Sequence, residues 1–378
     1  MNEAAKKYLR NTWYMAAWAS DLGSDLSGVT ICEEPILLFR KTNGDAAAIG
    51  GLCPHRFVPL TFGKKIGDDV QCGYHGMVFD SSGKCVLNPH HGGTISPGMK
   101  VPSYPVVERY GIIWLWMGVA EAADAELIPD FSCYDDPAFE TLHGVIDMKA
   151  NYELITDNLL DLTHGEFVHE GLLSSEAITI SKLETLESGS TVWANRWCPN
   201  DRAPPVWGQV LRDVLGLDLD TIVDHWLYMR WDAPAHLLLD VGITPLGKTR
   251  DDGIWVYAAH HITPVDATRS LYHWAIVRDH GLGDPAIDAF WRASIDAAFV
   301  GQDQPIIEAQ QAAIGHRTIE EMRPVGIPAD IPGGKARRAL RRLMASEAGG
   351  QRPERSIKSL RAILAEGAQS REPVLPAV

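Results

Sequence analysis

Two closely spaced cysteine–histidine pairs carry the most distinctive chemistry in this sequence of 378 residues. One residue separates Cys53 from His55, and two residues separate Cys72 from His75. Thiolate and imidazole groups are ligands that suit iron–sulfur clusters and zinc. Two short loops that each supply one sulfur and one nitrogen can give both cysteines to one iron and both histidines to the other. The spacing therefore predicts that these four residues hold a [2Fe–2S] cluster with mixed ligands.

A structural zinc site on the same four residues is the alternative interpretation. Zinc fingers usually place two cysteines first and two histidines second, which is not the order in this sequence. We therefore favour the iron–sulfur cluster. The other cysteines have no partner at ligand spacing and are expected to be buried, small apolar side chains. They are Cys32, Cys85, Cys133 and Cys198.

A second group of metal-binding side chains lies at residues 157–169. Two histidines and one carboxylate can form the facial triad that binds Fe(II) and leaves positions open for dioxygen. His164 and His169 are five residues apart, so on a regular α-helix they would be rotated by about 140° from each other. A π-type bulge or a break at Gly165 would bring them together. We therefore expect a distorted helix at this point.

The carboxylate of such a triad must come from another part of the chain. Asp303 is a candidate, in what we expect to be the last long helix. Spacing alone does not exclude three other acids, Asp279, Asp296 and Glu308. Asp161 precedes His164 by three residues and would lie on the same side of a helix. We expect Asp161 to orient His164 or to contact a group beyond the subunit rather than to bind the metal.

The elements that must position these residues are β-rich in the first third and mixed afterwards. Asn43-Gly44 predicts a hairpin, because this dipeptide favours the positive φ angles of a tight turn. Asp284-Pro285 predicts a helix start. An antiparallel sheet is predicted by runs of β-branched and aromatic residues. These runs are residues 236–243, 254–262 and 271–277.

The acidic, proline-containing segment 120–137 predicts a domain boundary, with one domain at residues 1–125 and another at residues 126–378. The tail at residues 333–378 is locally basic in an acidic protein. A solvated helical face or a docking surface for an acidic partner or a neighbouring subunit would account for this charge. Among its basic residues are Lys335, Arg337, Arg338, Arg341, Arg342, Arg352, Arg355, Lys358 and Arg361.

The overall composition limits the possible partners. The formal net charge is −15, whereas nucleic acids require a clustered basic face. The longest apolar runs are of strand length, far below the ~20 residues of a membrane-spanning helix, and the first residues do not resemble a secretory signal. Six cysteines are too few for a disulfide framework. We expect a cytoplasmic protein without a nucleic-acid or membrane partner.

The combined motifs resemble those of the Rieske non-heme iron oxygenases, and more narrowly the vanillate and dicamba O-demethylase oxygenase group. The matching patterns are Cys53-x-His55, Cys72-x-x-His75 and Asn158-x-x-Asp161-x-x-His164-x-x-x-x-His169. The resemblance covers most of the chain to about residue 325. It implies an α+β fold, in which a Rieske β-domain precedes a catalytic domain whose helices pack over an antiparallel sheet.

The resemblance also implies the ligands and partners. A mononuclear Fe(II) would be held by His164, His169 and Asp303. Asp161 and Asn158 would serve catalysis, with Asp161 contacting His75 of the partner subunit in a homotrimer. His260 would contact the substrate. Electrons would come from NADH through a separate reductase, with or without a ferredoxin.

The implied activity is O2-dependent O- or N-dealkylation of a small aromatic compound, which releases an aldehyde. Hydroxylation of a ring or side chain by the same iron centre is the alternative. A Rieske electron carrier is less favoured, because a carrier needs only about 110 residues and no second histidine motif. Residues 331–351 are expected to be an insertion relative to the demethylases.

Overall fold

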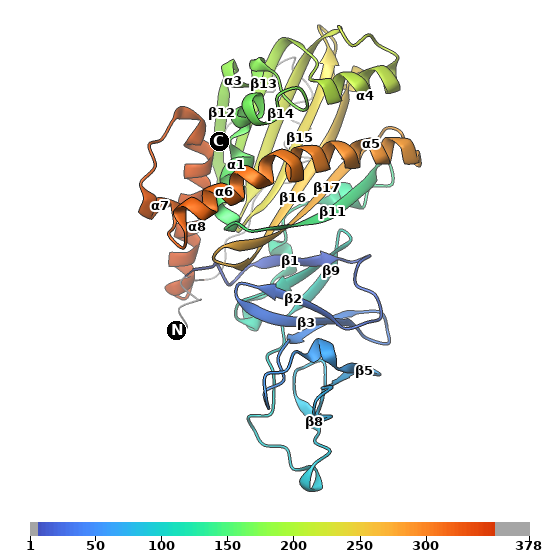
Figure 1. The fold of residues 1–378 in the computed structure, drawn as a ribbon, viewed down its shortest axis with the longest axis vertical. Helices are drawn as coiled ribbons and strands as arrows, with labels where there is room; N and C mark the ends of the chain where they lie inside the picture. The colour runs from blue at the N-terminus through green and yellow to red at the C-terminus, as the bar shows by residue number, and fades with distance from the viewer. Residues whose placement is uncertain (1–6, 352–378) are drawn as a thin grey trace. The chain divides into compact units, whose positions relative to one another are not determined.

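The computed structural model describes residues 7–351, which fall into two compact units (Figure 1). Unit 1 contains the described residues of Met1–Ile128, Thr263–Asp266 and Ser346–Pro353. Unit 2 contains Pro129–Ile262 and Ala267–Ala345. Unit 1 consists mainly of strands, whereas unit 2 combines a large sheet with helices. The predicted α+β fold class is confirmed.

Small antiparallel sheets form unit 1, with the strand orders β1-β10-β9, β2-β3-β4 and β5-β6-β7-β8. The predicted hairpin is confirmed, because residues 41–45 join β3 to β4 and Gly44 has a φ of 92°. The strands are β1 (Trp13–Trp18), β2 (Ser27–Ile31), β3 (Glu34–Arg40), β4 (Ala46–Gly50), β5 (Lys64–Ile66), β6 (Asp69–Gln71), β7 (Val78–Phe79), β8 (Cys85–Leu87), β9 (Val106–Arg109) and β10 (Ile112–Trp116).

Cys53 and Cys72 are part of the apolar core of unit 1. They pack with Leu60, Val70 and Phe79, each of which is fully buried. The two loops that carry the cysteine–histidine pairs are therefore anchored at their cysteines. The other four cysteines are also buried, as predicted.

A seven-stranded antiparallel sheet forms the centre of unit 2, with the order β11-β17-β16-β15-β14-β13-β12. The three apolar runs predicted to form an antiparallel sheet are its strands β15, β16 and β17, so that prediction is confirmed. The bounds are β11 (Glu140–Met148), β12 (Leu183–Ser188), β13 (Thr191–Arg202), β14 (Ile222–Asp232), β15 (His236–Pro245), β16 (Ile254–Asp266) and β17 (Arg269–Arg278).

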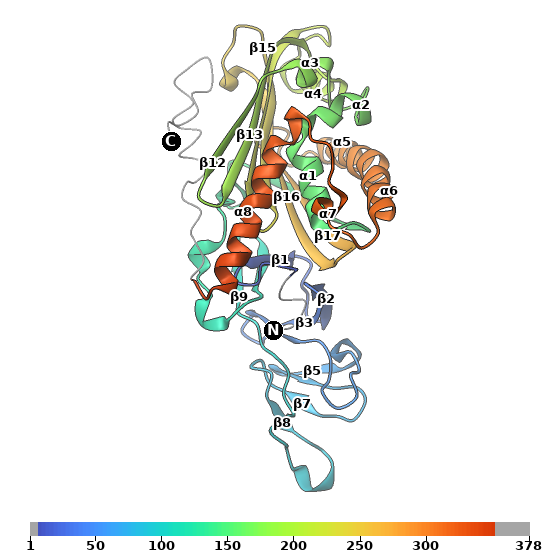
Figure 2. The ribbon, with the colours of Figure 1, turned by 90° about the vertical axis from the view of Figure 1, so that its left-hand side faces the viewer.

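Helices cover one face of this sheet, among them α1, α5 and α6 (Figure 2). The predicted helix start is confirmed, because the side chain of Asp284 caps α5 by accepting a hydrogen bond from the backbone N–H of Ala286. The helices are α1 (Tyr152–Leu160), α2 (Gly165–Val168), α3 (Glu176–Ile180), α4 (Pro205–Leu215), α5 (Pro285–Ile295), α6 (Gln304–Ile314), α7 (Ile319–Met322) and α8 (Ile331–Ala348).

Shorter helical segments connect these elements. Two of them matter for the site: the 3-10 turn η7 (Leu162–His164) and the π-helical segment η9 (Asp296–Asp303). The others are η2 (Leu60–Phe62), η3 (His91–Gly93), η4 (Ala120–Ala122), η5 (Ala125–Leu127), η6 (Ser132–Tyr134), η8 (Arg250–Asp252) and η10 (Pro328–Asp330).

Helix α8 bears on two expectations, the position of Asp303 and the role of the basic tail. Asp303 does not lie in the last long helix, because α8 follows it with 18 residues. The basic side chains of α8 that form ion pairs do so with acids of the same chain, including Asp157 and Glu187. Arg352, Arg355, Lys358 and Arg361 lie outside the described residues. Within residues 7–351, no helix is long and apolar enough to cross a membrane.

Candidate metal centres

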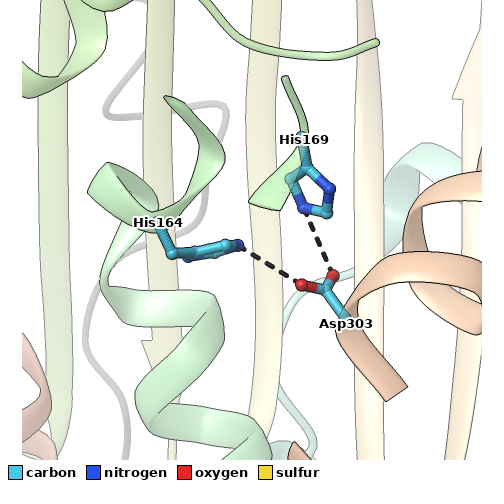
Figure 3. Close-up of side chains that lie close together, drawn as sticks. All are labelled: His164, His169 and Asp303. Atoms are coloured by element: carbon cyan, nitrogen blue, oxygen red, sulfur yellow. Dashed lines mark ion pairs between the residues drawn. The ribbon is translucent and has the colours of Figure 1, made fainter. Parts of the chain in front are cut away.

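His164, His169 and Asp303 converge in unit 2 (Figure 3). Nε2 of His164 lies 3.5 Å from Oδ1 of Asp303, and Nε2 of His169 lies 3.4 Å from Oδ2 of the same carboxylate. The potential ligand atoms are all within 4.8 Å of one another. His169 and Asp303 are buried, with 6% and 4% of their surfaces exposed. Two imidazoles and one carboxylate in this arrangement can hold a divalent transition-metal ion.

The chain brings the two histidines together by ending α1 before the first of them. Asp161 leaves the helical conformation, with φ −107° and ψ 88°, and its carboxylate accepts a hydrogen bond from the backbone N–H of Thr163 at 3.0 Å. The predicted distortion is present, but its predicted position at Gly165 is wrong, since Gly165 has ordinary helical angles. Gly165 instead permits close packing, because a Cβ there would lie 2.8 Å from Oγ of Ser174.

The carboxylate comes from the end of η9, directly before α6. Sequence spacing left Asp279, Asp296 and Glu308 open, and the structure brings Asp303 to the histidines. Glu308 accepts a hydrogen bond from the backbone N–H of Lys149 at 3.0 Å instead. π-Helical segments are frequent at functional sites. The sequence carried no signal for this one.

Neighbouring groups fix which nitrogen each imidazole presents. Nδ1 of His169 lies 2.9 Å from Oε1 of Gln302, and Nδ1 of His164 contacts the backbone carbonyl of Asp161. Both acceptors require a proton on Nδ1, which leaves Nε2 of each ring to face Asp303. Gln302 was missed in the sequence, where a lone glutamine has no distinguishing spacing. Asp161 was expected to orient His164 or to contact a group beyond the subunit, and it contacts His164 through its backbone carbonyl rather than its carboxylate.

The contacts of Asp303 show how well a cation fits this centre. Burial alone would lower the pKa of His169, yet its contact with Asp303 raises that pKa overall. The contact with Asp303 thus favours the protonated form of His169, and a metal ion would supply the same positive charge beside the buried carboxylate. Nδ2 of Asn158 donates a weak hydrogen bond to Oδ1 of Asp303 at 3.4 Å. The donor set fits a mononuclear iron.

The cysteine–histidine pairs lie on two loops of unit 1. The backbone N–H of Phe57 donates to the carbonyl of Cys53 at 2.8 Å, and that of Gly76 donates to the carbonyl of Cys72 at 3.1 Å. Each cysteine thus begins a tight turn that contains its histidine. Gly73 is required for close packing, since a Cβ there would lie 2.2 Å from the carbonyl oxygen of Phe62.

These loops bring the four predicted cluster residues together in pairs. The rings of His55 and His75 have centroids 4.5 Å apart. Burial, and to a lesser degree the adjacent thiol of Cys72, raises the pKa of Cys53 to about 11. The cysteines are buried while His55 is exposed. An inner pair of sulfurs and an outer pair of imidazoles fit a [2Fe–2S] cluster with one iron on each pair.

His260 lies on β16 beside the buried triad. Its Nδ1 is 2.7 Å from the hydroxyl of Tyr272, and its ring contacts that of Phe299 with a centroid separation of 5.7 Å. Burial lowers the pKa of His260 to about 3, and the nearby Asp303 opposes this shift. Its Nε2 has no hydrogen-bond partner among the described residues. Tyr272 was missed in the sequence because a single buried tyrosine is usually structural.

Two family models match the chain. The model for the Rieske [2Fe-2S] domain matches residues 12–105, and the model for the vanillate O-demethylase oxygenase C-terminal domain matches residues 148–346. The second match includes most of α8. The bounds of the match do not show whether residues 331–351 are inserted relative to the demethylases, which stays a prediction.

Characterised relatives are similar over nearly the whole chain. The oxygenase component of dicamba O-demethylase from Stenotrophomonas maltophilia is 32% identical over 341 residues, covering 90% of this chain and 99% of the relative. The oxygenase component of chloroacetanilide N-alkylformylase from Rhizorhabdus wittichii is 33% identical over 335 residues, covering 88% and 94%. The crystal structure of dicamba monooxygenase bound to 3,6-dichlorosalicylic acid superposes with a TM-score of 0.83, at 32% identity and 90% and 99% coverage.

Proposed function

This chain belongs to the Rieske non-heme iron oxygenases, as the oxygenase component of a multicomponent system, and on that premise we propose that it dealkylates a small aromatic ether or N-alkyl amide. The observation that carries the proposal is the buried convergence of His164, His169 and Asp303 in a chain that also has the Rieske ligand pairs. We propose that unit 1 corresponds to the Rieske domain, predicted at residues 1–125, and unit 2 to the catalytic domain, predicted at residues 126–378.

The ligand sets follow from the donor atoms. Cys53, His55, Cys72 and His75 would hold the [2Fe–2S] cluster, and the buried triad would hold the mononuclear Fe(II). When bound, the two metal groups supply electron storage and the activation of dioxygen toward a substrate C–H bond. The protein contributes fixed donors, since the side chain of Gln302 and the carbonyl of Asp161 keep Nε2 of both histidines directed at the centre.

His260 is proposed to bind the substrate. A buried nitrogen without a partner costs about 1–3 kcal/mol, and a polar group of the substrate at Nε2 would remove this cost. The hydroxyl of Tyr272 at Nδ1 holds the ring in place. The aromatic rings of Tyr272 and Phe299 stack with a centroid separation of 5.6 Å and would favour a flat substrate beside His260.

The proposed reaction inserts one oxygen atom into a C–H bond of the alkyl group. For a methyl ether, substrate, O2, NADH and a proton give the phenol, formaldehyde, NAD⁺ and water. The relatives act on alkyl groups bound to oxygen or nitrogen, according to the names dicamba O-demethylase and chloroacetanilide N-alkylformylase. Electrons would arrive from NADH through a separate reductase, with or without a ferredoxin.

We also propose a homotrimer in which the carboxylate of Asp161 contacts His75 of the partner subunit. Asp161 is half-buried, and among the described residues its carboxylate accepts hydrogen bonds only from Thr163, at 2.5 Å and 3.0 Å. Phe57 and Tyr74, which flank the cluster ligands, are 71% and 61% exposed. Phe167, between the two iron-binding histidines, is 72% exposed. Apolar side chains at both sites are expected of surfaces that meet in an assembly.

The test is aerobic turnover with NADH and a surrogate reductase on a panel of aromatic methyl ethers, N-alkyl anilides and plain aromatic acids. We expect one aldehyde for each dealkylated product, and no turnover by the variant His164→Ala. A hydroxylated product without aldehyde would instead establish the alternative, a ring or side-chain hydroxylase. A protein with two irons per chain rather than three would act as an electron carrier.

A further inference from the structure

Helix α8 lies beside α1, the helix that leads to His164 and His169 (Figure 2). Ion pairs connect the two helices at two successive turns. Glu153 and Asp157 are one turn apart on α1, and Arg337 and Arg341 are one turn apart on α8. Arg337 pairs with Asp157, and Arg341 pairs with Glu153 at 2.8 Å and 3.0 Å. The pairing is antiparallel and matched in spacing, so the two contacts resist both sliding and rotation of α1.

The contact between the helices is closely packed. A Cβ at Gly333 would lie 2.8 Å from Oδ1 of Asp157, so a larger residue there would displace the Asp157 carboxylate. Ala336 and Ala339, on the same helix, are buried. The Glu153 carboxylate is only 14% exposed. Partly buried charges are screened less than surface charges, so each arginine attracts its acid more strongly than in an exposed pair, while burial penalises the charged carboxylates.

The charge of Asp157 depends on Arg337. Burial raises the pKa of Asp157 to about 7, and Arg337 is the strongest influence that opposes this shift. Oδ1 of Asp157 has no hydrogen-bond partner among the described residues. Without the guanidinium group, a buried carboxylate here would have to take up a proton or move toward water. Either response would disturb the last turn of α1.

The last turn of α1 contacts two of the three proposed iron ligands. The backbone carbonyl of Asp157 accepts a hydrogen bond from the N–H of Asp161 at 3.1 Å, and the carbonyl of Asp161 holds Nδ1 of His164. Asn158, the next residue, donates to Asp303. The path from Arg337 to the centre therefore consists of one ion pair, one helical turn and two hydrogen bonds.

We propose that Arg337 is a positioning residue for the mononuclear metal centre, with Arg341 as its second contact on α1. By holding Asp157 and Glu153, α8 fixes the end of α1 and thereby the orientation of His164 and Asp303. The inference rests on the proposed function in one respect, namely that His164, His169 and Asp303 bind the metal.

The experiment measures Co(II) affinity in the full-length protein with its [2Fe–2S] cluster intact and the mononuclear site stripped by a chelator. The variant Arg337→Gln removes the charge, and Arg337→Lys retains it. Arg338→Gln is the matched control, since Arg338 is exposed on the same helix and has no ion pair with any described residue. The visible spectrum of the cluster reports that unit 1 is folded, and the melting temperature reports the stability of the variant chain.

We expect Arg337→Gln to weaken Co(II) binding by about tenfold, as for other groups that orient metal ligands. Arg337→Lys should recover part of this loss, and Arg338→Gln should stay within about twofold of the wild type. Co(II) affinity unchanged in Arg337→Gln, with or without a lower melting temperature, would overturn the inference. If that variant does not fold, Co(II) affinity is measured in Arg341→Gln, which removes the ion pair with Glu153, and unchanged affinity would again overturn the inference. Wild-type Co(II) binding that is indifferent to His164→Ala would instead contradict the proposed ligand set.

Discussion

Nδ2 of Asn158 lies 3.4 Å from Oδ1 of Asp303, so the end of α1 meets the π-helical segment at the carboxylate that both histidines contact. The amide of Asn158 thus connects α1 to Asp303, which is far from it in the sequence. A carboxylate with two imidazoles and one amide around it has little freedom to rotate. The arrangement implies that the orientation of Asp303 is set before a metal binds.

Replacing Asn158 should therefore weaken the centre without unfolding the protein. In Asn158→Ala, Asp303 loses its amide donor and gains rotational freedom. We expect the affinity for the mononuclear metal to fall by about tenfold, the lower end of what loss of a ligand-orienting group costs. Iron content and turnover per bound iron are the measurements. Full activity at wild-type iron content would show that the 3.4 Å contact has no role.

Gln302 should control which nitrogen of His169 is available. In Gln302→Leu, Nδ1 loses its acceptor at 2.9 Å, so a proton on Nε2 becomes equally favourable and competes with the metal. We expect metal affinity to fall by about tenfold, because the neutral tautomer with a free Nε2 is no longer favoured. The loss should not grow at low pH, since the contact with Gln302 raises the pKa of His169 and its removal weakens the competition by protons. Gln310→Leu is the control, since Gln310 is exposed. Equal affinities of both variants across pH 6–8 would refute this role.

The residue types of both proposed metal sites were predictable from the sequence, but the neighbouring groups that orient them were not. Cysteine and histidine at short, repeated spacing are typical of metal sites, whereas Gln302 contacts His169 across 133 positions of sequence. The distortion that brings His164 and His169 together was expected at Gly165, as a π-type bulge or a break. It occurs at Asp161, whose carboxylate caps the backbone of Thr163, and such a local hydrogen bond competes with the helix without changing the apolar pattern.

In the fold, too, features set by local sequence were predictable, whereas contacts between distant elements were not. Asn43-Gly44 and the runs of β15–β17 were predictable because turn chemistry and β-branched residues act locally. The π-helical segment before α6 was not, because its apolar residues repeat at spacings that also suit an α-helix. The basic residues of α8 were recognised, but not their acids on α1, because charge patterning shows which face is charged and not what it meets.

Tyr272→Phe should separate substrate binding from metal binding. The variant loses the hydroxyl that holds Nδ1 of His260 at 2.7 Å but keeps the ring. One hydrogen bond of this kind contributes about 0.5–1.5 kcal/mol, which corresponds to a decrease in kcat/KM of roughly two- to tenfold. Most of the change should appear in KM, and Co(II) affinity should be unchanged. A loss of metal affinity in Tyr272→Phe would mean that the pair supports Asp303 instead.

Buried neutral histidines should make unit 2 sensitive to acid. Burial lowers the pKa of His225 and of His273 to about 3, and neither ring nitrogen of His225 has a hydrogen-bond partner among the described residues. A folded-state pKa below the unfolded value means that the unfolded chain binds more protons as the pH falls below about 6.5. The free energy of unfolding should therefore decrease on acidification, by about 1.4 kcal/mol per pH unit for each such histidine.

His225→Phe tests this origin of acid sensitivity directly. The variant removes one titrating group from a site that contacts Trp207, with a ring separation of 6.2 Å in the wild type. Its melting temperature should decrease less than that of the wild type between pH 7 and pH 5, whatever its value at pH 7. His316→Phe is the control, because His316 is exposed and should leave the pH dependence as it is. Parallel curves for His225→Phe and the wild type would place the acid sensitivity in other groups.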